Sequence, residues 1–272
     1  MSAATAGDAS PSVASAAARA ALGRTALPDL SRLKAIIFDV DGTLYRQGRL
    51  RRLMLLRLLK AHLTRPRRGY ATLKALRAYR NAQEAMRQGD QCGGGGDLAA
   101  QQLRLACARA GVEADAMAAC VARWMEQEPL DLLGGALRAG VFELLRAAKE
   151  RGLRLGVCSD YPASRKLAAM RLANFFEVVV SAQDSEVRRF KPDPRGLEVA
   201  LQRLGVAPHE ALYVGDRMET DAVAARRAGI SCVIVGDGHR RRANTDGAAQ
   251  VSTLLELRDA LCQQHDELRR PA

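Results

Sequence analysis

Residues 35–44 read AIIFDVDGTL, and this stretch decides how the rest of the chain is organised. The first four residues form a short, continuous apolar run, which predicts a buried β-strand over residues 35–38. Gly42 breaks the pattern soon afterwards, so we expect the strand to end where the acidic residues begin. Two carboxylates, those of Asp39 and Asp41, are therefore expected just beyond a buried strand.

Further apolar runs of the same character alternate with segments of helical character. The additional predicted strands are residues 153–158, 177–181, 211–215 and 230–235. Helices are predicted over residues 141–151, 163–173, 194–204, 220–228 and 254–262. Continuous apolar strands that alternate with helices indicate a parallel sheet covered on both faces. We therefore expect an α/β fold with a Rossmann-like, doubly wound parallel sheet of five strands.

A long helical segment interrupts this alternation after the first strand. Residues 47–132 are rich in Leu, Ala and Arg and have no strand-like run, which predicts a helical domain inserted into the core. The run from Gln91 to Asp97 holds four consecutive glycines and predicts a flexible joint within this insert. The core domain is then expected over residues 31–46 and 133–272, and residues 1–30 are expected to form a disordered tail.

The net charge of +12 is concentrated in one part of the insert. From Arg46 to Asp90 there are thirteen Arg and Lys residues and two acidic residues. A basic surface of this kind attracts anions such as phosphate esters, nucleic acid or acidic lipid. The alternative is a helix face that is simply solvated. Aromatic residues make up only 4% of the chain, which disfavours a stacking platform for single-stranded nucleic acid.

The composition excludes several other classes of protein. Hydrophobic residues make up 48%, which is enough for a packed core, and no apolar run approaches the length of a membrane span. The six cysteines form no CxxC pair and the four histidines show no zinc-binding spacing, so zinc is not expected. Scattered cysteines and the lack of a secretory signal lead us to expect reduced thiols and a cytoplasmic protein.

Asp39 and Asp41 are candidates for chemistry on a phosphate ester. Two carboxylates one residue apart repel each other unless a cation or a proton lies between them, and hard oxygen ligands favour Mg²⁺. One carboxylate could attack phosphorus while the other serves as general acid and base. Gly42 would let the backbone approach the phosphate closely. The alternative is an Asp-Gly turn in which Thr43 caps a helix.

Further polar residues follow the other predicted strands, and carboxyl ends of parallel strands meet at one edge of a sheet. Ser159 could donate a hydrogen bond to a phosphoryl oxygen. Lys191 precedes Pro192 in a stiff loop, where its ammonium could neutralise both the aspartate and the phosphoryl group. Asp216 could complete a metal site, and Asp221 could hold a metal-bound water or orient Lys191. The alternatives are helix caps and a solvated lysine.

Together these four motifs, in this order, resemble the haloacid dehalogenase (HAD)-like hydrolase superfamily over about Leu33 to Leu261. The position of the long insert after the first motif resembles the branch of phosphoglycolate phosphatase and β-phosphoglucomutase. The resemblance implies that Asp39 is a nucleophile that becomes aspartyl-phosphate and that Asp41 is the acid and base. It further implies phosphate binding by Gly42, Thr43, Ser159 and Lys191, Mg²⁺ binding by Asp39, Asp216 and the backbone carbonyl of Asp41, and a supporting role for Asp221.

The resemblance also implies how the site is covered. The long insert lies between Asp41 and Ser159, which is typical of members with a helical C1-type cap that closes over the site. Dehalogenases of the superfamily lack the second aspartate, so Asp41 favours phosphoryl transfer. Three details depart from the common pattern. Asp160 follows the serine where an asparagine is frequent, and Arg217 occupies an often small or polar position. The chain also reads Ala139-Gly140-Val141 where Pro-Gly-Val is common.

The expected function is hydrolysis of a small phosphomonoester by a Mg²⁺-dependent phosphatase, with a small phosphorylated metabolite as its partner. Neither a membrane nor nucleic acid is expected as a partner, and the sequence leaves the oligomeric state open. Two alternatives remain at this point. One is a sugar phosphomutase of the same superfamily, and the other is a polyanion-binding protein in which the enzyme-like core is secondary.

Overall fold

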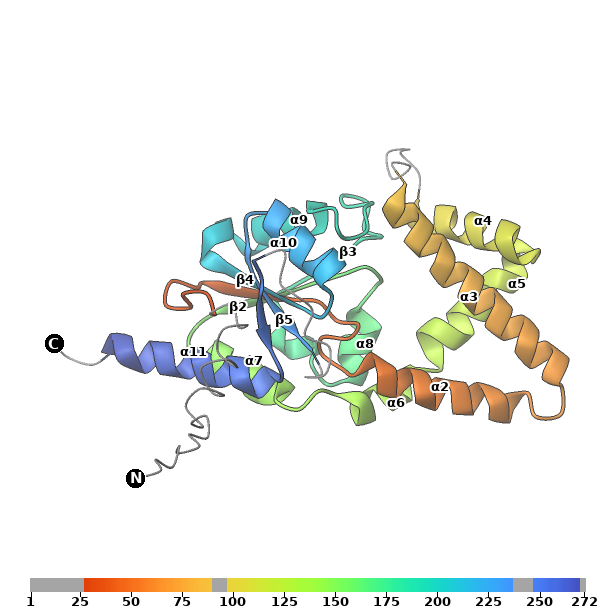
Figure 1. Cartoon of the computed structure of the whole chain (residues 1–272), viewed down its shortest axis with the longest axis horizontal. Coiled ribbons are helices and arrows are strands. Elements are labelled where there is room, and N and C mark those ends of the chain that lie inside the picture. The colour runs from red at the N-terminus through yellow and green to blue at the C-terminus, as the bar shows by residue number, and fades with distance from the viewer. Residues whose placement is uncertain (1–26, 90–96, 237–246, 270–272) are drawn as a thin grey trace, which may run out of the picture.

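A six-stranded parallel sheet forms the centre of the molecule, with strand order β3-β2-β1-β4-β5-β6 (Figure 1). The computed structural model describes residues 27–89, 97–236 and 247–269. The strands are β1 (Ala35–Phe38), β2 (Arg154–Ser159), β3 (Val178–Ser181), β4 (Ala211–Gly215), β5 (Ser231–Val235) and β6 (Ala249–Val251). The doubly wound parallel α/β fold is thus confirmed.

The predicted number of five strands is wrong, because β6 pairs with β5 at the edge of the sheet. This strand has only three residues, and Gln250 lies at its centre. It therefore lacks the continuous apolar run by which the other strands were predicted.

Helices cover both faces of the sheet, and alternate residues of β1 point to the two sides. Ile36 and Phe38 pack in one buried cluster with residues of α7 and α11, whereas Ala35 and Ile37 pack in the other with residues of α9 and α10. The core helices are α7 (Val141–Glu150), α8 (Ser164–Ala169), α9 (Arg195–Leu204), α10 (Val223–Arg227) and α11 (Leu254–Arg269).

The inserted region between β1 and β2 contains only helices and connecting turns over residues 47–89 and 97–132. Its elements are α2 (Gln47–Ala61), α3 (Pro66–Gln88), α4 (Leu98–Ala110), α5 (Ala114–Val121), the π-helical turn η2 (Ala122–Gln127) and α6 (Leu130–Leu133). Figure 1 shows α2 running away from the sheet and α3 crossing back to pack with α4 and α5. Most of the predicted joint lies outside the described residues, while Asp97 caps α4 by accepting hydrogen bonds from the backbone N–H groups of Ala99 and Ala100.

The start of the packed chain differs from the predicted boundary. Leu30 was assigned to the tail, but its side chain is fully buried in the cluster that includes Ile36 and Phe38. Residues 1–26 lie outside the described part of the chain. Within the described residues, none of the helices has both the length and the apolar character that crossing a bilayer requires.

Small side chains set the close packing of α3 against α4. The buried cluster between these helices contains Ala75, Ala78 and Ala82 of α3 and Ala106 and Ala110 of α4. Ala82 and Ala106 are fully buried, so neither position has room for a longer side chain.

We therefore expect Ala82→Leu to lower the free energy of unfolding by about 1–3 kcal/mol through overpacking. Urea denaturation measures this change. Ala71→Leu is the matched control, because Ala71 is an exposed residue of the same helix. Equal stability of the two variants would contradict the packing described for α3 and α4.

Candidate active site

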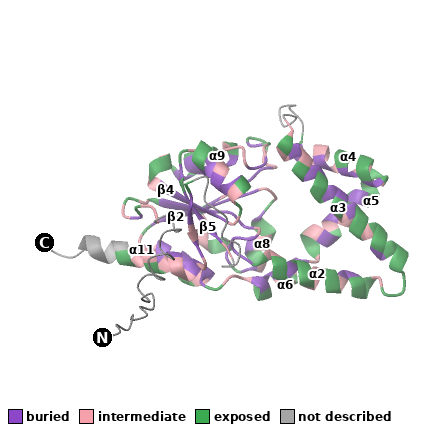
Figure 2. Cartoon of the chain, viewed as in Figure 1, coloured by how far each residue is buried: buried purple, intermediate pink, exposed green. Residues whose placement is uncertain are grey.

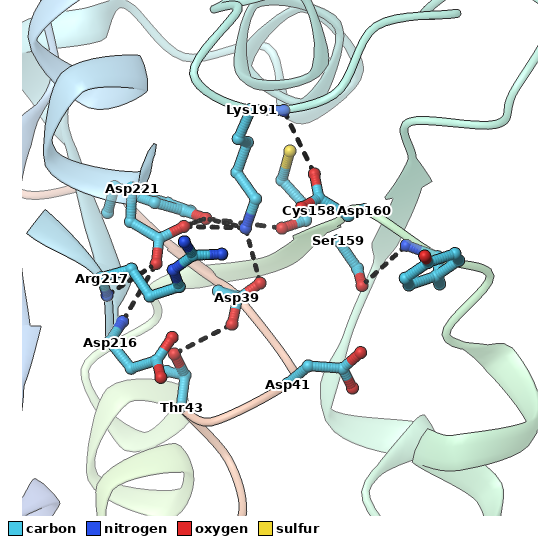
Figure 3. Close-up of polar contacts among 12 residues, drawn as sticks. Asp39, Asp41, Thr43, Cys158, Ser159, Asp160, Lys191, Asp216, Arg217 and Asp221 are labelled. Atoms are coloured by element: carbon cyan, nitrogen blue, oxygen red, sulfur yellow. Dashed lines mark hydrogen bonds and ion pairs between the residues drawn. The ribbon is translucent and has the colours of Figure 1, made fainter. Parts of the chain in front are cut away.

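Polar side chains from three neighbouring strands meet at the carboxyl edge of the sheet (Figure 3). Asp39 follows β1, Ser159 ends β2 and Asp216 follows β4. The strand order reverses here, with β2 and β4 on opposite sides of β1, and this is the position where open α/β sheets bind ligands. The three residues line a cleft of about 1500 Å³ between the core and the inserted helices.

Lys191 is the centre of the charge network. Its Nζ lies 2.6 Å from Oδ1 of Asp39 and 2.8 Å from Oδ1 of Asp221, and it donates to the hydroxyl of Tyr213 at 3.0 Å. Lys191 and Asp221 are buried and Asp39 is only 5% exposed. Burial disfavours the ammonium, but the charges of Asp221 and Asp39 outweigh it and raise the pKa of Lys191 well above its ordinary value.

The pKa values of Asp39 and Asp221, which share Lys191 as a partner, shift in opposite directions. Burial and the neighbouring carboxylates raise the pKa of Asp39, against the opposing charge of Lys191. Asp221 is also buried, but the ammonium of Lys191 and backbone hydrogen bonds lower its pKa. Its Oδ2 accepts hydrogen bonds from the N–H groups of Asp216 and Arg217 at 3.1 and 3.0 Å. Asp221 is therefore a fixed negative charge beneath the site.

A π-helical turn, η6 (Met218–Ala222), brings Asp221 back towards β4. The approach is so close that a Cβ atom at Gly215 would lie 2.5 Å from Cβ of Asp221. Gly42 likewise allows Asp216 to approach the backbone closely, because a Cβ atom at Gly42 would overlap the carboxylate of Asp216. The φ of Gly42 is +110°, which also favours glycine. Glycine at both positions is required for the carboxylates to gather.

The gathered carboxylates have the chemistry of a site for a hard divalent cation. Oxygen atoms of Asp39, Asp216 and Asp221 all lie within 4.8 Å of one another, the only such metal-capable group in the described ranges. With Lys191, the three acids carry a formal charge of minus two when all are ionised. Burial and the charge of Asp221 raise the pKa of Asp216 to about 7. A bound cation would offset this excess of negative charge.

Asp41 points to the other side of the cleft, where the sequence offered no signal for its partners. Lys166 of α8 donates to both carboxylate oxygens of Asp41 at 2.6 and 2.7 Å, and the Tyr45 hydroxyl donates to Oδ1 at 2.7 Å. Burial alone would raise the pKa of Asp41, but Lys166 and these hydrogen bonds lower it below its ordinary value. Asp41 is thus held as a carboxylate, with its charge neutralised by Lys166.

Asp160, the residue that departs from the common pattern, is paired with an arginine of the inserted helices. Arg87 of α3 forms a short ion pair with Oδ2 of Asp160, and Oδ1 accepts the backbone N–H of Lys191 at 3.1 Å. Both side chains are largely buried, at 8% and 12% exposed. The negative charge of Asp160 is therefore neutralised, and α3 is linked to the loop after β2.

The structure thus brings most of the predicted site residues together. The cleft is lined by Asp39, Asp41, Ser159, Lys191, Asp216 and Asp221. Gly42 and Thr43 do not line it, and the Thr43 hydroxyl donates instead to Oδ2 of Asp39 at 3.1 Å. Sequence reasoning missed Lys166, Tyr45, Arg87 and Tyr213. Their partners lie in other segments of the chain or follow no motif, so no local pattern could have identified them.

Comparison with known proteins supports this picture. The sequence model of the haloacid dehalogenase-like hydrolases matches residues 33–229, which is more than half of the chain. The chain is 39% identical over 116 residues to a phosphoglycolate phosphatase of Rhodospirillum rubrum, covering 42% of this chain and 47% of that protein. It is 30% identical over 215 residues to a glyceraldehyde 3-phosphate phosphatase of Methanopyrus kandleri, covering 76% and 85%. The alignment thus spans about half of the first relative and most of the second.

Among solved structures, a 2-haloacid dehalogenase from Pseudomonas syringae has a similar fold. The TM-score is 0.59 at 21% identity, covering 85% of this chain and 99% of that chain. At this level of identity the similarity shows a shared fold and carries no information on the reaction.

The pair of Arg87 and Asp160 gives a direct test of the link between α3 and the core. Arg87→Met is expected to lower the free energy of unfolding by about 3 kcal/mol, because it leaves Asp160 buried without its partner. Adding Asp160→Asn should recover most of the loss, as measured by urea denaturation of the single and double variants. Glu84→Gln removes only an exposed partner of Arg87 and should cost less than about 1 kcal/mol. Identical losses for Arg87→Met and the double variant would contradict this link.

Proposed function

The chain belongs to the haloacid dehalogenase-like hydrolases, and from this premise we propose that it is a Mg²⁺-dependent phosphatase that hydrolyses a phosphomonoester. One observation carries the proposal: the buried ammonium of Lys191 holds Oδ1 of Asp39 at the carboxyl end of β1. A carboxylate fixed in this way, in a cleft open to a ligand, is suited to attack an electrophilic phosphorus atom. The phosphatases named among the relatives of the chain also support it.

In the proposed first step, a carboxylate oxygen of Asp39 attacks phosphorus and the bond from phosphorus to the ester oxygen breaks. An aspartyl-phosphate forms, and the leaving oxygen takes a proton from the Asp41 carboxyl group. In the second step a water molecule attacks phosphorus, its proton passes to Asp41, and the aspartyl bond breaks to release phosphate and the Asp39 carboxylate. Lys191 and Ser159 both line the cleft, where they would stabilise the charge of the transferred group.

The contacts of Asp41 affect its proposed role as general acid and base. As a carboxylate held by Lys166 and Tyr45, Asp41 is in the form that accepts a proton from water. To act as the acid in the first step, it has to take up a proton and loosen its contact with Lys166. We therefore interpret the arrangement as a resting state of the site, with Lys166 as a positioning residue for Asp41.

The proposed metal ligands are the side chains of Asp39 and Asp216 and the backbone carbonyl of Asp41, with Asp221 close by. When bound, Mg²⁺ would neutralise the excess negative charge of the carboxylates and of the phosphate. The oxygen-only donor set and the local charge of minus two fit this ion. Asp221 itself is engaged by Lys191 and two backbone N–H groups, so its role would be to hold Lys191 in place.

We also propose that residues 47–132 act as a cap. These helices supply one wall of the cleft, and Arg87 links them to the loop that follows β2. Movement of the helices towards the core would exclude bulk water while Asp39 attacks phosphorus, and it would bring side chains of the cap onto the leaving group.

The proposal predicts that the chain hydrolyses p-nitrophenyl phosphate when Mg²⁺ is present and that chelation with EDTA abolishes the reaction until Mg²⁺ is restored. Asp39→Asn should lower kcat/KM by at least about a thousandfold, because it replaces the nucleophilic carboxylate with a neutral amide. Asp259→Asn is the matched control, since Asp259 is an exposed residue of α11 on the core and should leave the rate unchanged.

Hydrolysis by Asp39→Asn at the rate of the unsubstituted protein would exclude Asp39 as the nucleophile. The phosphomutase alternative is tested in the same assay with a hexose 1-phosphate. Formation of the 6-phosphate in excess of free phosphate would favour the mutase over the phosphatase.

A further inference from the structure

The cleft has a second half that the proposed chemistry does not use. The inserted helices contribute polar side chains to this part of the cleft, such as Gln83 and Glu126, and also a group of apolar ones, which we call the apolar wall. Met54 and Leu55 come from α2, Leu73 and Leu76 from α3, and Met125 from η2. Leu55 is 46% and Leu73 39% exposed, although both face a cavity. Apolar side chains that stay exposed on a concave surface are typical of a ligand site.

Small polar leaving groups would not match this wall. The hydroxyl groups of a sugar or glycerol need hydrogen-bond partners, and Met and Leu side chains provide none. A hydrocarbon group would remove apolar surface from water on both sides of the contact, which is favourable. The cleft volume of about 1500 Å³ has room for a group much larger than a two- or three-carbon alcohol.

Cationic side chains also line the cleft. Arg51 of α2 and Arg77 and Arg80 of α3 line the same cleft, and none of them forms an ion pair with a residue in the described part of the chain. They would draw an anionic head group towards the carboxylates, where Mg²⁺ and Lys191 would receive it. The lining of the cleft therefore combines carboxylates and cations with a group of apolar side chains.

We infer that the substrate is an amphiphilic phosphomonoester, whose leaving alcohol carries a long hydrocarbon chain that packs against the apolar wall. This inference rests on the proposed function, because it assigns a leaving group to the same site. It explains the apolar residues that α2 and α3 present to the cleft, which the chemistry at Asp39 does not require.

Hydrolysis of ethyl, butyl, hexyl and octyl phosphate with Mg²⁺, each below its micellar concentration, tests the inference. kcat/KM should rise about two- to threefold per added methylene, because each methylene is buried against the wall. Leu55→Ser combined with Leu73→Ser should flatten this dependence. Leu105→Ser is the matched control, since Leu105 is an exposed leucine of α4 that does not line the cleft.

The outcomes separate this inference from the proposed function. Hydrolysis of all four esters with equal kcat/KM would overturn the apolar site and leave the phosphatase standing. If no ester and no p-nitrophenyl phosphate is hydrolysed, the proposed function fails. Calorimetry with alkylphosphonates, which cannot be hydrolysed, then tests binding to the apolar wall independently of catalysis. Tighter binding of octylphosphonate than of ethylphosphonate supports the inference, and equal binding overturns it.

An independent observation concerns the other side of α2. Leu56, Leu59 and Leu63 are 64%, 53% and 81% exposed, and their spacing places them along one side of the helix and its following turn. None of the three lines the cleft. We call this stripe, together with Arg52 and Lys60 on the same side, the outer face of α2. Figure 2 shows α2 and the start of α3 as largely exposed.

The charge around the outer face is of one sign. No acidic residue occurs in the sequence between Asp41 and Glu84. Exposed cations surround the leucines, and none forms an ion pair with a described residue: Arg49, Arg52, Lys60, Arg65, Arg67 and Arg68. A second copy of the chain would bring like charges together, which disfavours self-association through this face. Nucleic acid would satisfy the arginines but leave the leucines in water.

The geometry points to the surface of an anionic bilayer as the occupant of the outer face. Leucines would enter the boundary of the acyl chains while Arg and Lys contact lipid phosphates, as in helices that lie in the plane of a membrane. This departs from the expectation that the protein has no membrane partner. It also fits an amphiphilic substrate, because α2 contributes to both the outer face and the cleft.

Flotation with lipid vesicles tests the surface. The full chain should bind vesicles of phosphatidylcholine mixed with phosphatidylglycerol, should not bind phosphatidylcholine alone, and should be released by salt. A triple variant of Leu56, Leu59 and Leu63, each to Ser, should bind at least about tenfold more weakly. Leu105→Ser should bind as the unsubstituted chain does. Equal binding by the triple variant, or tighter binding to an oligonucleotide than to anionic vesicles, would overturn the assignment.

Discussion

The buried ammonium of Lys191 is the constraint on which the site depends. Carboxylates from two separate segments, Asp39 after β1 and Asp221 in η6, lie within hydrogen-bond distance of it and would otherwise be buried charges without a partner. An unpaired buried charge is strongly destabilising, so the loop that carries Lys191 has to lie across the ends of these strands. The same contacts leave an excess of negative charge beside Asp216, which is the condition for a divalent cation to bind.

The remaining charges of the cleft are paired locally, and these pairs join the core to the inserted helices. Lys166 neutralises Asp41, and Arg87 neutralises Asp160 while linking α3 to the core. Because these charges are compensated, the unpaired cations of α2 and α3 can face a ligand. The inserted helices then serve two surfaces: an apolar wall inside the cleft and a leucine stripe with flanking cations outside it. Both surfaces favour an amphiphilic partner over a fully polar one.

Sequence alone predicted the parts of the structure that depend on local pattern. Continuous apolar runs gave all strands except β6, which is short and contains Gln250. The rule that the carboxyl ends of parallel strands gather at one edge predicts that Asp39, Ser159 and Asp216 lie together. The contacts of Asp41 and Asp160 could not be predicted, because Lys166 and Arg87 lie in helices 125 and 73 residues away and reach the site only through tertiary packing. The apolar wall could not be predicted from the sequence either, because periodicity indicates which residues share a helix face but not which other elements that face contacts.

The central claim is that Asp39, held by Lys191, forms a covalent bond to phosphorus. The most direct measurement is to quench the enzyme with acid during turnover with Mg²⁺, reduce it with borohydride and map the product by mass spectrometry. Hydride reduces an aspartyl-phosphate to homoserine, so the account predicts homoserine at position 39 and unmodified aspartate at positions 41, 216 and 221. Homoserine at another of these positions, or phosphate release with no modified aspartate at any time point, would contradict it.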